Sequence, residues 1–392
     1  MSQGLEPKQE AVWIGSLDSA VRKKLLTTSY SVLYAEPGYL LYVTEGKLMA
    51  HRFDMKKLEL DGDPTVVATN VQIQKGASGY AAFSASHNGV LAYQQATGAV
   101  TQLVWFDRNG TRLSAAGPPG DYDELSLSPN GMRVALNRRN PDSGSEDIWL
   151  IELSGGRLSR LTFHTGDRTP VWHPDGSRIA FASPREGRLD LYMKTSTGAG
   201  REVALLSSAQ SKWPSDFSPD GRILIFEADD PSTKLDLWML PVFEDGKPQL
   251  FLQTQFNESQ GEISPDGRWI AYTSDETGQP EVYVQTFPSL SGKWQISNRG
   301  GSQPAWRNDC KELYYLDSEQ RLVAVPLKLE PNLEPDSPRP LFETTMQRAD
   351  LGWNKQYVPS PDGQRFLINT QGQDSNASLI AVVLNWTSPL QK

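Results

Sequence analysis

The stretch that decides the fold is Gly261-Glu262-Ile263-Ser264-Pro265-Asp266-Gly267-Arg268-Trp269-Ile270-Ala271-Tyr272. Two runs with apolar residues flank a Ser-Pro-Asp-Gly turn, which is typical of two antiparallel strands joined by a tight turn. Pro265 sets φ at about −65° for the second turn position, and Asp266 can accept hydrogen bonds from its own backbone. Gly267 supplies the left-handed residue that reverses the chain. The stretch therefore predicts a β-hairpin.

The same hairpin pattern recurs along the whole chain. Its last turn position falls at Gly38, Gly89, Gly131, Gly176, Gly221, Gly267, Cys310 and Gly363. Most copies stand 42 to 46 residues apart, with intervals of 51 and 53 at the two ends. A period in the low forties, with strands and no helical pattern, is typical of a four-stranded propeller blade.

An acidic residue opens an alternating apolar strand after each strong hairpin. These residues are Asp147, Asp190, Asp236 and Glu281. Because the acid recurs blade by blade, we expect it to pair with a neighbouring loop and to be structural rather than catalytic.

The repeats predict an all-β chain that folds as a β-propeller of four-stranded antiparallel blades. The first interpretation is one propeller domain of eight blades over 10–388, preceded by a disordered lead-in at 1–9. The alternative is a six-bladed ring from about 118 to 386, closed by Gln102-Leu103-Val104-Trp105-Phe106-Asp107, with residues 1 to 100 left from a preceding ring. Both stay open, because the two termini together offer one strand too many for a simple closure.

The whole-chain composition narrows the classes of function. A net charge of −9 and a pI near 5.1 argue against nucleic acid as a partner, since phosphate contacts need clustered Lys and Arg. No window of about 20 apolar residues predicts insertion into a membrane, and the N-terminus lacks the pattern of a signal peptide. The sequence as written is therefore expected in the cytoplasm. The one cysteine, Cys310, cannot form an internal disulfide.

Several stretches resemble the TolB-like, WD-repeat-like propeller family, and more narrowly the propeller region of bacterial serine/threonine protein kinases. They are Pro37-Gly38-Tyr39-Leu40-Leu41-Tyr42, Leu103-Val104-Trp105-Phe106-Asp107-Arg108, Phe251-Leu252-Gln253-Thr254-Gln255-Phe256-Asn257-Glu258, Gly300-Gly301-Ser302-Gln303-Pro304 and Val383-Leu384-Asn385-Trp386. The resemblance implies a protein, peptide or cell-envelope ligand. It also implies a kinase domain upstream in a longer parent, and an extracytoplasmic location if that parent spans the membrane.

Motifs for chemistry are absent or incomplete. His51-Arg52-Phe53-Asp54 differs from a kinase catalytic loop, and Gly76-Ala77-Ser78-Gly79 is one residue short of a nucleophile elbow. The four histidines are not at metal-ligand spacing, and His87 and His173 are expected to face solvent in turns. We therefore expect no catalytic residue, no cofactor and no metal.

The loops that lead into each first strand open on one rim of the ring, where propellers usually bind partners. The candidate partner-binding residues there are Asp167, Arg168, Lys212, Trp213, Asn257, Glu258, Gln260, Gln303 and Trp353. The two tryptophans are aromatic residues in polar loops, which favours a contact role. The alternative is that both cap the ends of blades.

These features predict a non-catalytic binding module that resembles the sensor or scaffold region of a receptor-type kinase. One alternative is a TolB-like periplasmic adaptor. The other is a propeller enzyme, a lyase or glycosidase, with a site at the mouth of the channel. A convergent cluster of His and carboxylates on one rim would favour the enzyme, and the sequence shows no sign of one.

Overall fold

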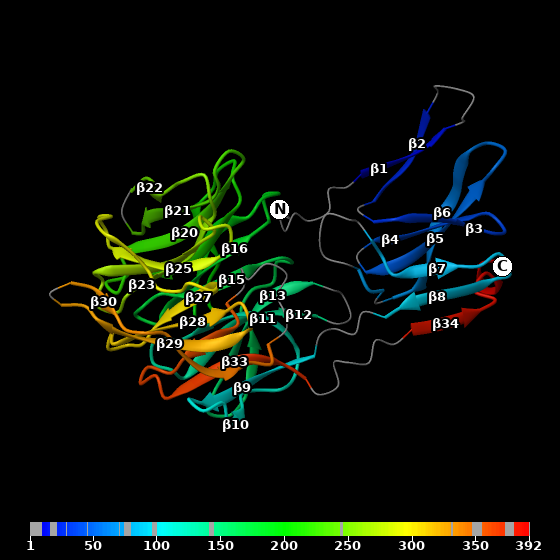
Figure 1. Cartoon of the computed structure of the whole chain (residues 1–392). Coiled ribbons are helices and arrows are strands. Elements are labelled where there is room, and N and C mark those ends of the chain that lie inside the picture. Colours follow the sequence, from blue (N-terminus) through cyan, green and yellow to red (C-terminus); the bar gives the residue numbers. More distant parts are fainter. Residues whose placement is uncertain are drawn as a thin grey trace. The chain divides into compact units, whose positions relative to one another are not determined.

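The computed structural model describes residues 10–15, 22–28, 30–44, 46–69, 71–73, 80–95, 100–140, 145–243, 246–330, 332–346, 355–372 and 380–391 (Figure 1). The predicted lead-in at 1–9 lies outside these residues. The chain divides into two compact units, which differs from the single domain expected over 10–388. Unit 1 comprises Met1–Ala99, Asn140–Gly144 and Gln373–Lys392, and unit 2 comprises Val100–Arg139 and Ser145–Gly372.

The described residues of unit 1 form three antiparallel sheets. The first pairs β1 (Glu10–Gly15) with β2 (Arg22–Thr28), and the second joins β3 (Val32–Ala35), β4 (Tyr39–Thr44), β5 (Lys47–Asp54) and β6 (Glu59–Ala68) in chain order. The third has the order β34 (Ile380–Leu384), β8 (Val90–Gln94), β7 (Phe83–Ala85). Leu41, Leu48 and Leu91 are fully buried in the hydrophobic core of unit 1. No helix of the described residues has the length and apolar character to cross a membrane.

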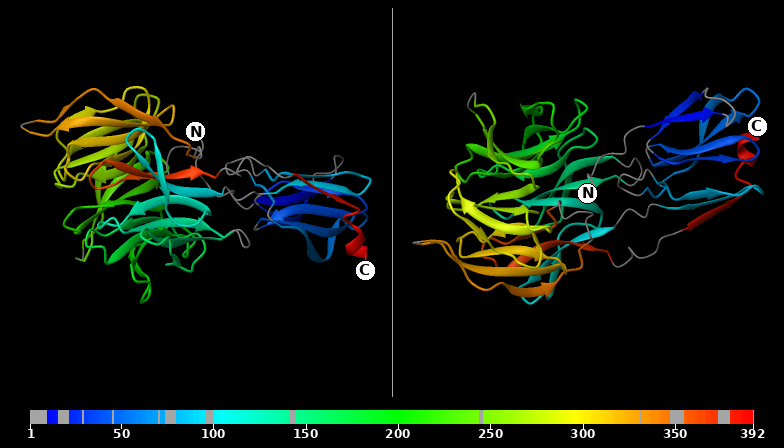
Figure 2. Two further views of the ribbon diagram at one scale, coloured as in Figure 1. Left: turned by 90° about the horizontal axis from the view of Figure 1, so that it is seen from below. Right: turned by 45° about the horizontal axis from the view of Figure 1, so that its top comes forward.

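Unit 2 contains six antiparallel sheets among its described residues. Five of them follow the chain order. They are β11 (Asp121–Leu127), β12 (Arg133–Arg139), β13 (Glu146–Glu152), β14 (Leu158–Arg160); β15 (Arg168–Trp172), β16 (Arg178–Ser183), β17 (Asp190–Thr195), β18 (Val203–Leu206); β19 (Lys212–Phe217), β20 (Ile223–Asp230), β21 (Lys234–Pro241), β22 (Gln249–Leu252); β23 (Glu258–Ile263), β24 (Trp269–Ser274), β25 (Glu281–Thr286), β26 (Lys293–Gln295); and β27 (Gly301–Trp306), β28 (Glu312–Asp317), β29 (Arg321–Lys328), with β30 (Glu334–Pro335) and β31 (Arg339–Glu343) both paired to β29. The segment around β30 extends from the edge of the unit in both views of Figure 2.

The sixth sheet closes the ring with strands from both ends of unit 2. Its order is β10 (Arg112–Ala115), β9 (Thr101–Asp107), β33 (Arg365–Gln371), β32 (Tyr357–Pro359). The inner strands β11, β15, β19, β23, β27 and β32 each contact the next, and β32 contacts β11. The contacts therefore run around a common axis, and the fold is an all-β propeller.

The strand pairing agrees with the six-bladed alternative and not with eight blades in one ring. β9 pairs with β33 over its whole length, as expected for the closing stretch from Gln102 to Asp107, so the last sheet is complete without further strands. The alternative placed the end of the ring near residue 386, and this is corrected. β34 pairs with β8 in unit 1, so the ring ends at β33.

The turn chemistry predicted from the repeat is confirmed. Ser264 Oγ donates to Asp266 Oδ1 at 2.5 Å and accepts the backbone N–H of Trp269 at 3.0 Å. Gly267 has a φ of 73°. Cys310 keeps the same left-handed backbone, with a φ of 60°, although it is not glycine.

The acidic residues that open the third strands are buried and bonded, which confirms their structural role. Asp190 accepts hydrogen bonds from Ser207 Oγ at 2.6 Å and Lys212 Nζ at 2.7 Å. Asp147 pairs with Arg160 at 2.7 Å. These bonds tie the fourth strand of a blade and the loop after it to the third strand.

His173 is buried, so the prediction that it faces solvent is wrong. Its ring packs edge-on against Phe217 and Phe243, with centroid distances of 5.1 and 5.6 Å. The ring replaces the smaller Ser of the other turns and fills the space between two blades. His87 is exposed, as expected.

Candidate binding site at the axial end of the ring

The inner strands carry a bulge at corresponding places, and this positions the polar groups of one axial end. The ladder shifts register between Asp123 and Leu125 in β11, and at matching points in β15, β19, β23 and β27. We call the residue five places before the first turn residue the rim position, and the next residue the junction position. Rim positions hold Asp123, Arg168, Trp213, Ser259, Ser302 and Lys355, and junction positions hold Glu124, Thr169, Pro214, Gln260, Gln303 and Gln356.

The junction residues connect neighbouring blades by hydrogen bonds. Gln260 Oε1 accepts the backbone N–H of Gln303 at 2.7 Å, and Gln303 Oε1 accepts that of Gln356 at 2.8 Å. Glu124, Thr169, Gln260 and Gln303 all have φ values between 38° and 56°. A bulge changes the direction in which the side chains near it point. The junction residue can therefore direct its side chain toward the backbone of the next blade.

Two carboxylates make the same kind of connection. Glu124 Oε2 accepts the N–H of Thr169 at 2.7 Å and Asn137 Nδ2 at 3.0 Å. Glu227, in the second strand of its blade, accepts the N–H of Gln260 at 2.6 Å and Ser215 Oγ at 3.2 Å. The axial end therefore carries charge-bearing groups among neutral amides.

Burial among the inner strands changes how these acids ionise. It raises the pKa of Glu124, Asp216 and Glu227 to about 7. For Glu124 the carboxylate of Asp123 raises the pKa further, and for Asp216 that of Glu262 does the same. Carboxyl groups with such shifts are more frequent at functional sites than elsewhere.

Lys355 reaches from the closing blade past the β27 blade to the β23 blade. Its Nζ donates to Glu262 Oε2 at 2.6 Å. Burial lowers the pKa of Lys355, but the carboxylates of Glu262 and Asp216 raise it by more, so the ammonium is kept charged. The closing blade and the β23 blade are therefore joined by a partly exposed ion pair at this axial end.

Three of the predicted partner-binding residues lie beneath the surface. Asp167, Lys212 and Glu258 are at most 1 % exposed. Asp167 is 3.3 Å from Arg185, Lys212 donates to Asp190, and Glu258 Oε1 accepts Thr254 Oγ1 at 2.6 Å. We correct their assignment as contact residues, because each side chain is already bonded inside the unit: Asp167 within its own blade, and Lys212 and Glu258 to the preceding blade or the loop that leaves it.

The other predicted residues are divided between the rim, the junctions and a loop. Arg168 and Trp213 are half-exposed at rim positions, and Gln260 and Gln303 occupy junctions. Asn257 binds both oxygens of Asp275 through its backbone N–H and its Nδ2, at 2.9 and 2.7 Å. Trp353 lies outside the described residues.

Sequence reasoning missed the residues with the strongest electrostatic effects: Glu124, Asp216, Glu227, Glu262 and Lys355. One signal was available for Glu227, which stands alone as a charged residue in the run Ile223-Leu224-Ile225-Phe226-Glu227-Ala228. A carboxylate inside a buried strand needs a partner, which indicates a site. No such signal existed for Glu124, because its role depends on the bulge.

The other end of the ring carries a hollow of about 600 Å³, lined by Arg268, Trp269, Thr286, Leu329 and Glu330. It lies at the turn side of the blades and contains no cluster of acids. Among the described residues, no group of three His, Cys, Asp or Glu side chains is placed to hold a metal ion. The axial end therefore remains the candidate binding site.

Comparisons with known proteins support a TolB-like propeller. No family model matches the chain. A "Tol-Pal system protein TolB" from Francisella tularensis is 26 % identical over 148 residues, which is 38 % of this chain and 31 % of that protein. The chain thus matches about a third of the length of this curated relative.

Solved structures give the same likeness. A putative TolB from Agrobacterium tumefaciens superposes with a TM-score of 0.54 and 18 % identity, over 70 % of this chain and 98 % of that one. TolB from Acinetobacter baumannii superposes with a TM-score of 0.47 and 14 % identity, over 87 % and 79 % of the two chains. The first superposition shows the fold.

Proposed function

We propose that unit 2 is a module that binds a protein or peptide at the axial end, as a TolB-like adaptor of the bacterial cell envelope. The similarity to TolB proteins in sequence and fold supports an adaptor more directly than the sensor region of a kinase. The proposal includes a periplasmic location, and it assigns no reaction to the chain.

The observation that carries the proposal is the composition of three successive rim positions. Asp123, Arg168 and Trp213 occupy the same place in β11, β15 and β19, and all three are half-exposed. The indole of Trp213 has neither a ring contact nor a hydrogen bond to any described residue. Trp and Arg are the residues that most often dominate binding energy at protein interfaces. Side by side with an acid, they suit a peptide that has both apolar and charged groups.

Site-specific photo-crosslinking tests this assignment. A benzophenone amino acid would replace Trp213 in the full chain, and in a control chain it would replace Val203, which is exposed on an outer strand. Both proteins would be irradiated with an envelope extract of a bacterium that carries the gene. We expect a discrete protein adduct from position 213 alone, weakened when Arg168 is changed to Ala. Equal adducts from both positions would refute the proposal.

A kinase-sensor role is a narrower form of the same proposal. It rests on the stretches that resemble kinase-linked propellers and needs a kinase domain in the same reading frame. Sequencing the region upstream of the gene tests it directly, because an unrelated upstream frame would leave only the adaptor.

A second candidate, a propeller glycosidase or lyase, is favoured by one observation. The acids Glu124, Asp216 and Glu227 have pKa values of about 7, which suits a general acid. No histidine of unit 2 contributes to this cluster, since His164 lies beside Asp167 and His173 lies at a turn. Turnover of envelope glycans that is lost in Glu227→Gln, with the fold intact, would support the enzyme.

A further inference from the structure

The junction between the β11 and β15 blades is the one at which the junction residue itself carries a charge, whereas the Gln260 junction receives its carboxylate from Glu227 in a second strand. At the next two comparable junctions, Gln260 and Gln303 accept the same kind of backbone N–H with a neutral amide oxygen. At this one, Glu124 accepts the N–H of Thr169 with a carboxylate. Burying a charged group is unfavourable, so glutamine would serve the fold at least as well.

Two polar oxygens beside Glu124 accept no hydrogen bond from a described residue. The carboxylate only accepts hydrogen bonds, so the amide of Asn137 must turn its Nδ2 toward it. Asn137 is 4 % exposed, and its Oδ1 has no partner among the described residues. Thr169 Oγ1 is also buried, and its hydroxyl lies close enough to the Glu124 carboxylate to lower the pKa of that acid, but its oxygen accepts no hydrogen bond from a described residue. At the Gln260 junction, by contrast, the hydroxyl of Thr273 donates a hydrogen bond to Gln260 Oε1 at 2.8 Å.

The backbone at this junction is also strained. Glu124 has a φ of 38° and Thr169 a φ of 55°, and a β-branched residue in that region is unusual. Strain of this kind persists where the surroundings fix it and is concentrated at functional sites. Gln260 and Gln303 share this left-handed backbone, so this junction is set apart by its carboxylate together with the unmet hydrogen bond of Asn137.

We propose that Glu124, Asn137 and Thr169 form a subsite for a guanidinium or ammonium group of the bound peptide. The carboxylate supplies the negative charge, and Asn137 Oδ1 and Thr169 Oγ1 accept further N–H groups. A guanidinium has five N–H donors in a fixed plane, so it can serve several acceptors at once. This inference rests on the proposed function, because it names the chemistry of the partner at the same axial end.

Ionisation of Glu124 couples such binding to pH. Burial, followed by the charge of Asp123, raises its pKa to about 7, whereas Thr169 and the guanidinium of Arg168 lower it. A cation binds the carboxylate and not the neutral acid. With a pKa of about 7, about a tenth of the group is ionised at pH 6 and about nine tenths at pH 8. We expect the affinity for a cation to rise about tenfold over that range.

Two matched peptides test the subsite with the full chain. The first is a fluorescein-labelled peptide, acetyl-Gly-Ser-Arg-Gly-Ser-amide, and the second carries citrulline, a neutral isostere, in place of arginine. Fluorescence anisotropy would give the affinity of each at pH 6, 7 and 8. We expect the arginine peptide to bind at least tenfold more tightly at pH 8, with the difference nearly lost at pH 6. Equal affinities at pH 8 would overturn the proposal.

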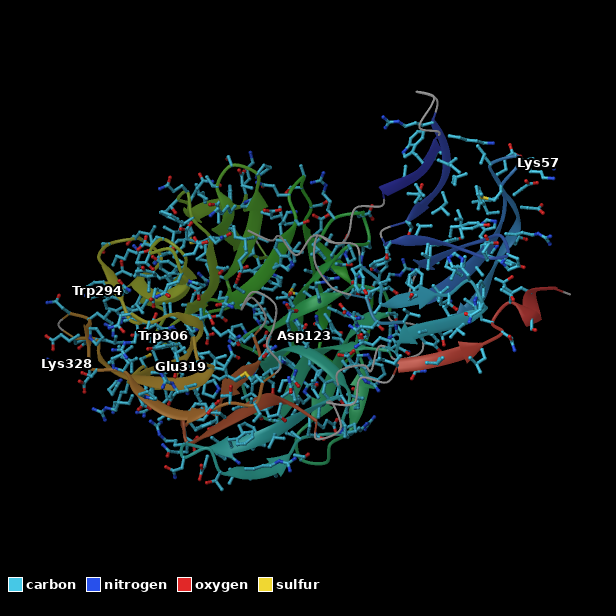
Figure 3. The ribbon with its side chains drawn as sticks, turned by 45° about the vertical axis from the view of Figure 1, so that its right-hand side comes forward. Lys57, Asp123, Trp294, Trp306, Glu319 and Lys328 are labelled. Carbon is cyan, nitrogen blue, oxygen red and sulfur yellow. The ribbon has the colours of Figure 1, made fainter. Side chains whose placement is uncertain are left out.

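Glu124→Gln is the decisive variant, because glutamine already fills three equivalent positions in the ring, at Gln260, Gln303 and Gln356. We expect it to unfold at the temperature of the parent or above it, to lose the preference for arginine, and to bind the arginine peptide with an affinity that does not change with pH. Glu319→Gln is the control, since Glu319 is an exposed carboxylate on the same unit, labelled with Asp123 in Figure 3. It should bind the arginine peptide as the parent does. An unchanged preference in Glu124→Gln would refute the subsite.

The result can be separated from that of the crosslinking experiment. Preference for arginine that depends on Glu124, without a protein adduct at position 213, would leave the subsite in place and remove the rim as the contact surface. An adduct at 213 with no preference for arginine would support the rim and refute the cationic partner.

Discussion

The guanidinium of Arg108 holds both carboxylate oxygens of Glu312, at 2.8 and 2.9 Å. Arg108 follows β9 in the closing sheet, and Glu312 lies in the β27–β31 sheet beside it. The same guanidinium donates to the carbonyl of Gly363 at 3.0 Å and to the hydroxyl of Tyr314 at 3.2 Å. One side chain therefore joins the end of β9 in the closing sheet, the turn of the last hairpin and the neighbouring blade.

Arg108→Met should weaken this closure. The change leaves the partly buried carboxylate of Glu312 with fewer partners, and loss of a charged hydrogen bond of this kind reduces the free energy of unfolding by about 1–3 kcal/mol. For a unit of this size each kcal/mol lowers Tm by about 2–4 °C. Calorimetry would measure the change. Arg268→Met is the control, because Arg268 makes ion pairs at an exposed site and should shift Tm far less. Equal shifts would contradict a closing role.

Cys310→Gly should stabilise unit 2. Cys310 holds a φ of 60° at the turn position where the other clear copies have glycine. A residue with a Cβ in that conformation is disfavoured by roughly 1–2 kcal/mol, although glycine also loses more entropy on folding and offsets part of the gain. We expect a rise in Tm of a few degrees, measured under reducing conditions. Cys310→Ala, which keeps the Cβ, is the control and should not raise Tm. A lower Tm in the glycine variant would contradict the turn assignment.

Lys212→Met should destabilise the β15 and β19 blades severely. Lys212 and Asp190 are both nearly fully buried and 2.7 Å apart, so removing the ammonium leaves an uncompensated carboxylate inside the protein. Breaking a buried pair in this way costs about 3–5 kcal/mol. Urea denaturation would measure the decrease in the free energy of unfolding. Lys328→Met removes an exposed partner of Glu334 and should change stability by less than about 1 kcal/mol. A similar small loss for both variants would show that Lys212 is free to act at the surface.

The sequence was sufficient for the parts of the fold that depend on local chemistry. Ser264, Asp266 and Gly267 determine their turn within four residues, so the repeat predicts where the hairpins lie. Ring closure depends on which of two apolar strands pairs with β33, and the patterns of 101–107 and 380–384 do not differ enough to decide it. The pairing of β9 with β33, and of β34 with β8, separates the six-bladed ring from the eight-bladed one.

The candidate site was harder to predict, for a physical reason. A bulge in each inner strand changes the face on which the following residues lie, so alternation in the sequence misplaces them. From its sequence neighbours Lys212 is expected to be an exposed loop residue. Its side chain is buried instead, because it forms an ion pair with Asp190, which lies 22 residues earlier. Trp213, its neighbour, stays half-exposed as predicted. Glu124 and Glu227 become notable only through bonds to another blade.

Glu227 should make a contribution to the stability of unit 2 that is lost as pH rises from about 4.5 to about 7. Burial raises the pKa of Glu227 from its ordinary value of 4.5 to about 7, so the folded protein binds a proton there that the unfolded chain has already released. The proton stabilises the fold fully below the ordinary pKa, and this contribution is lost as pH rises from about 4.5 to about 7. The upper limit of the loss is about 3 kcal/mol, and partial access to water reduces it to about 1–3.

Glu227→Gln removes this dependence and keeps the bonds, because a glutamine oxygen can accept the N–H of Gln260 and the hydroxyl of Ser215. We expect the variant to match the parent near pH 4.5 and to exceed it by about 1–3 kcal/mol at pH 8, measured by urea denaturation at each pH. Glu319→Gln, on the exposed surface, should follow the parent throughout. If the variant were instead less stable at pH 8, Glu227 would carry a favourable charge in the folded state, and a cation held at the axis even in the purified protein would be its natural cause.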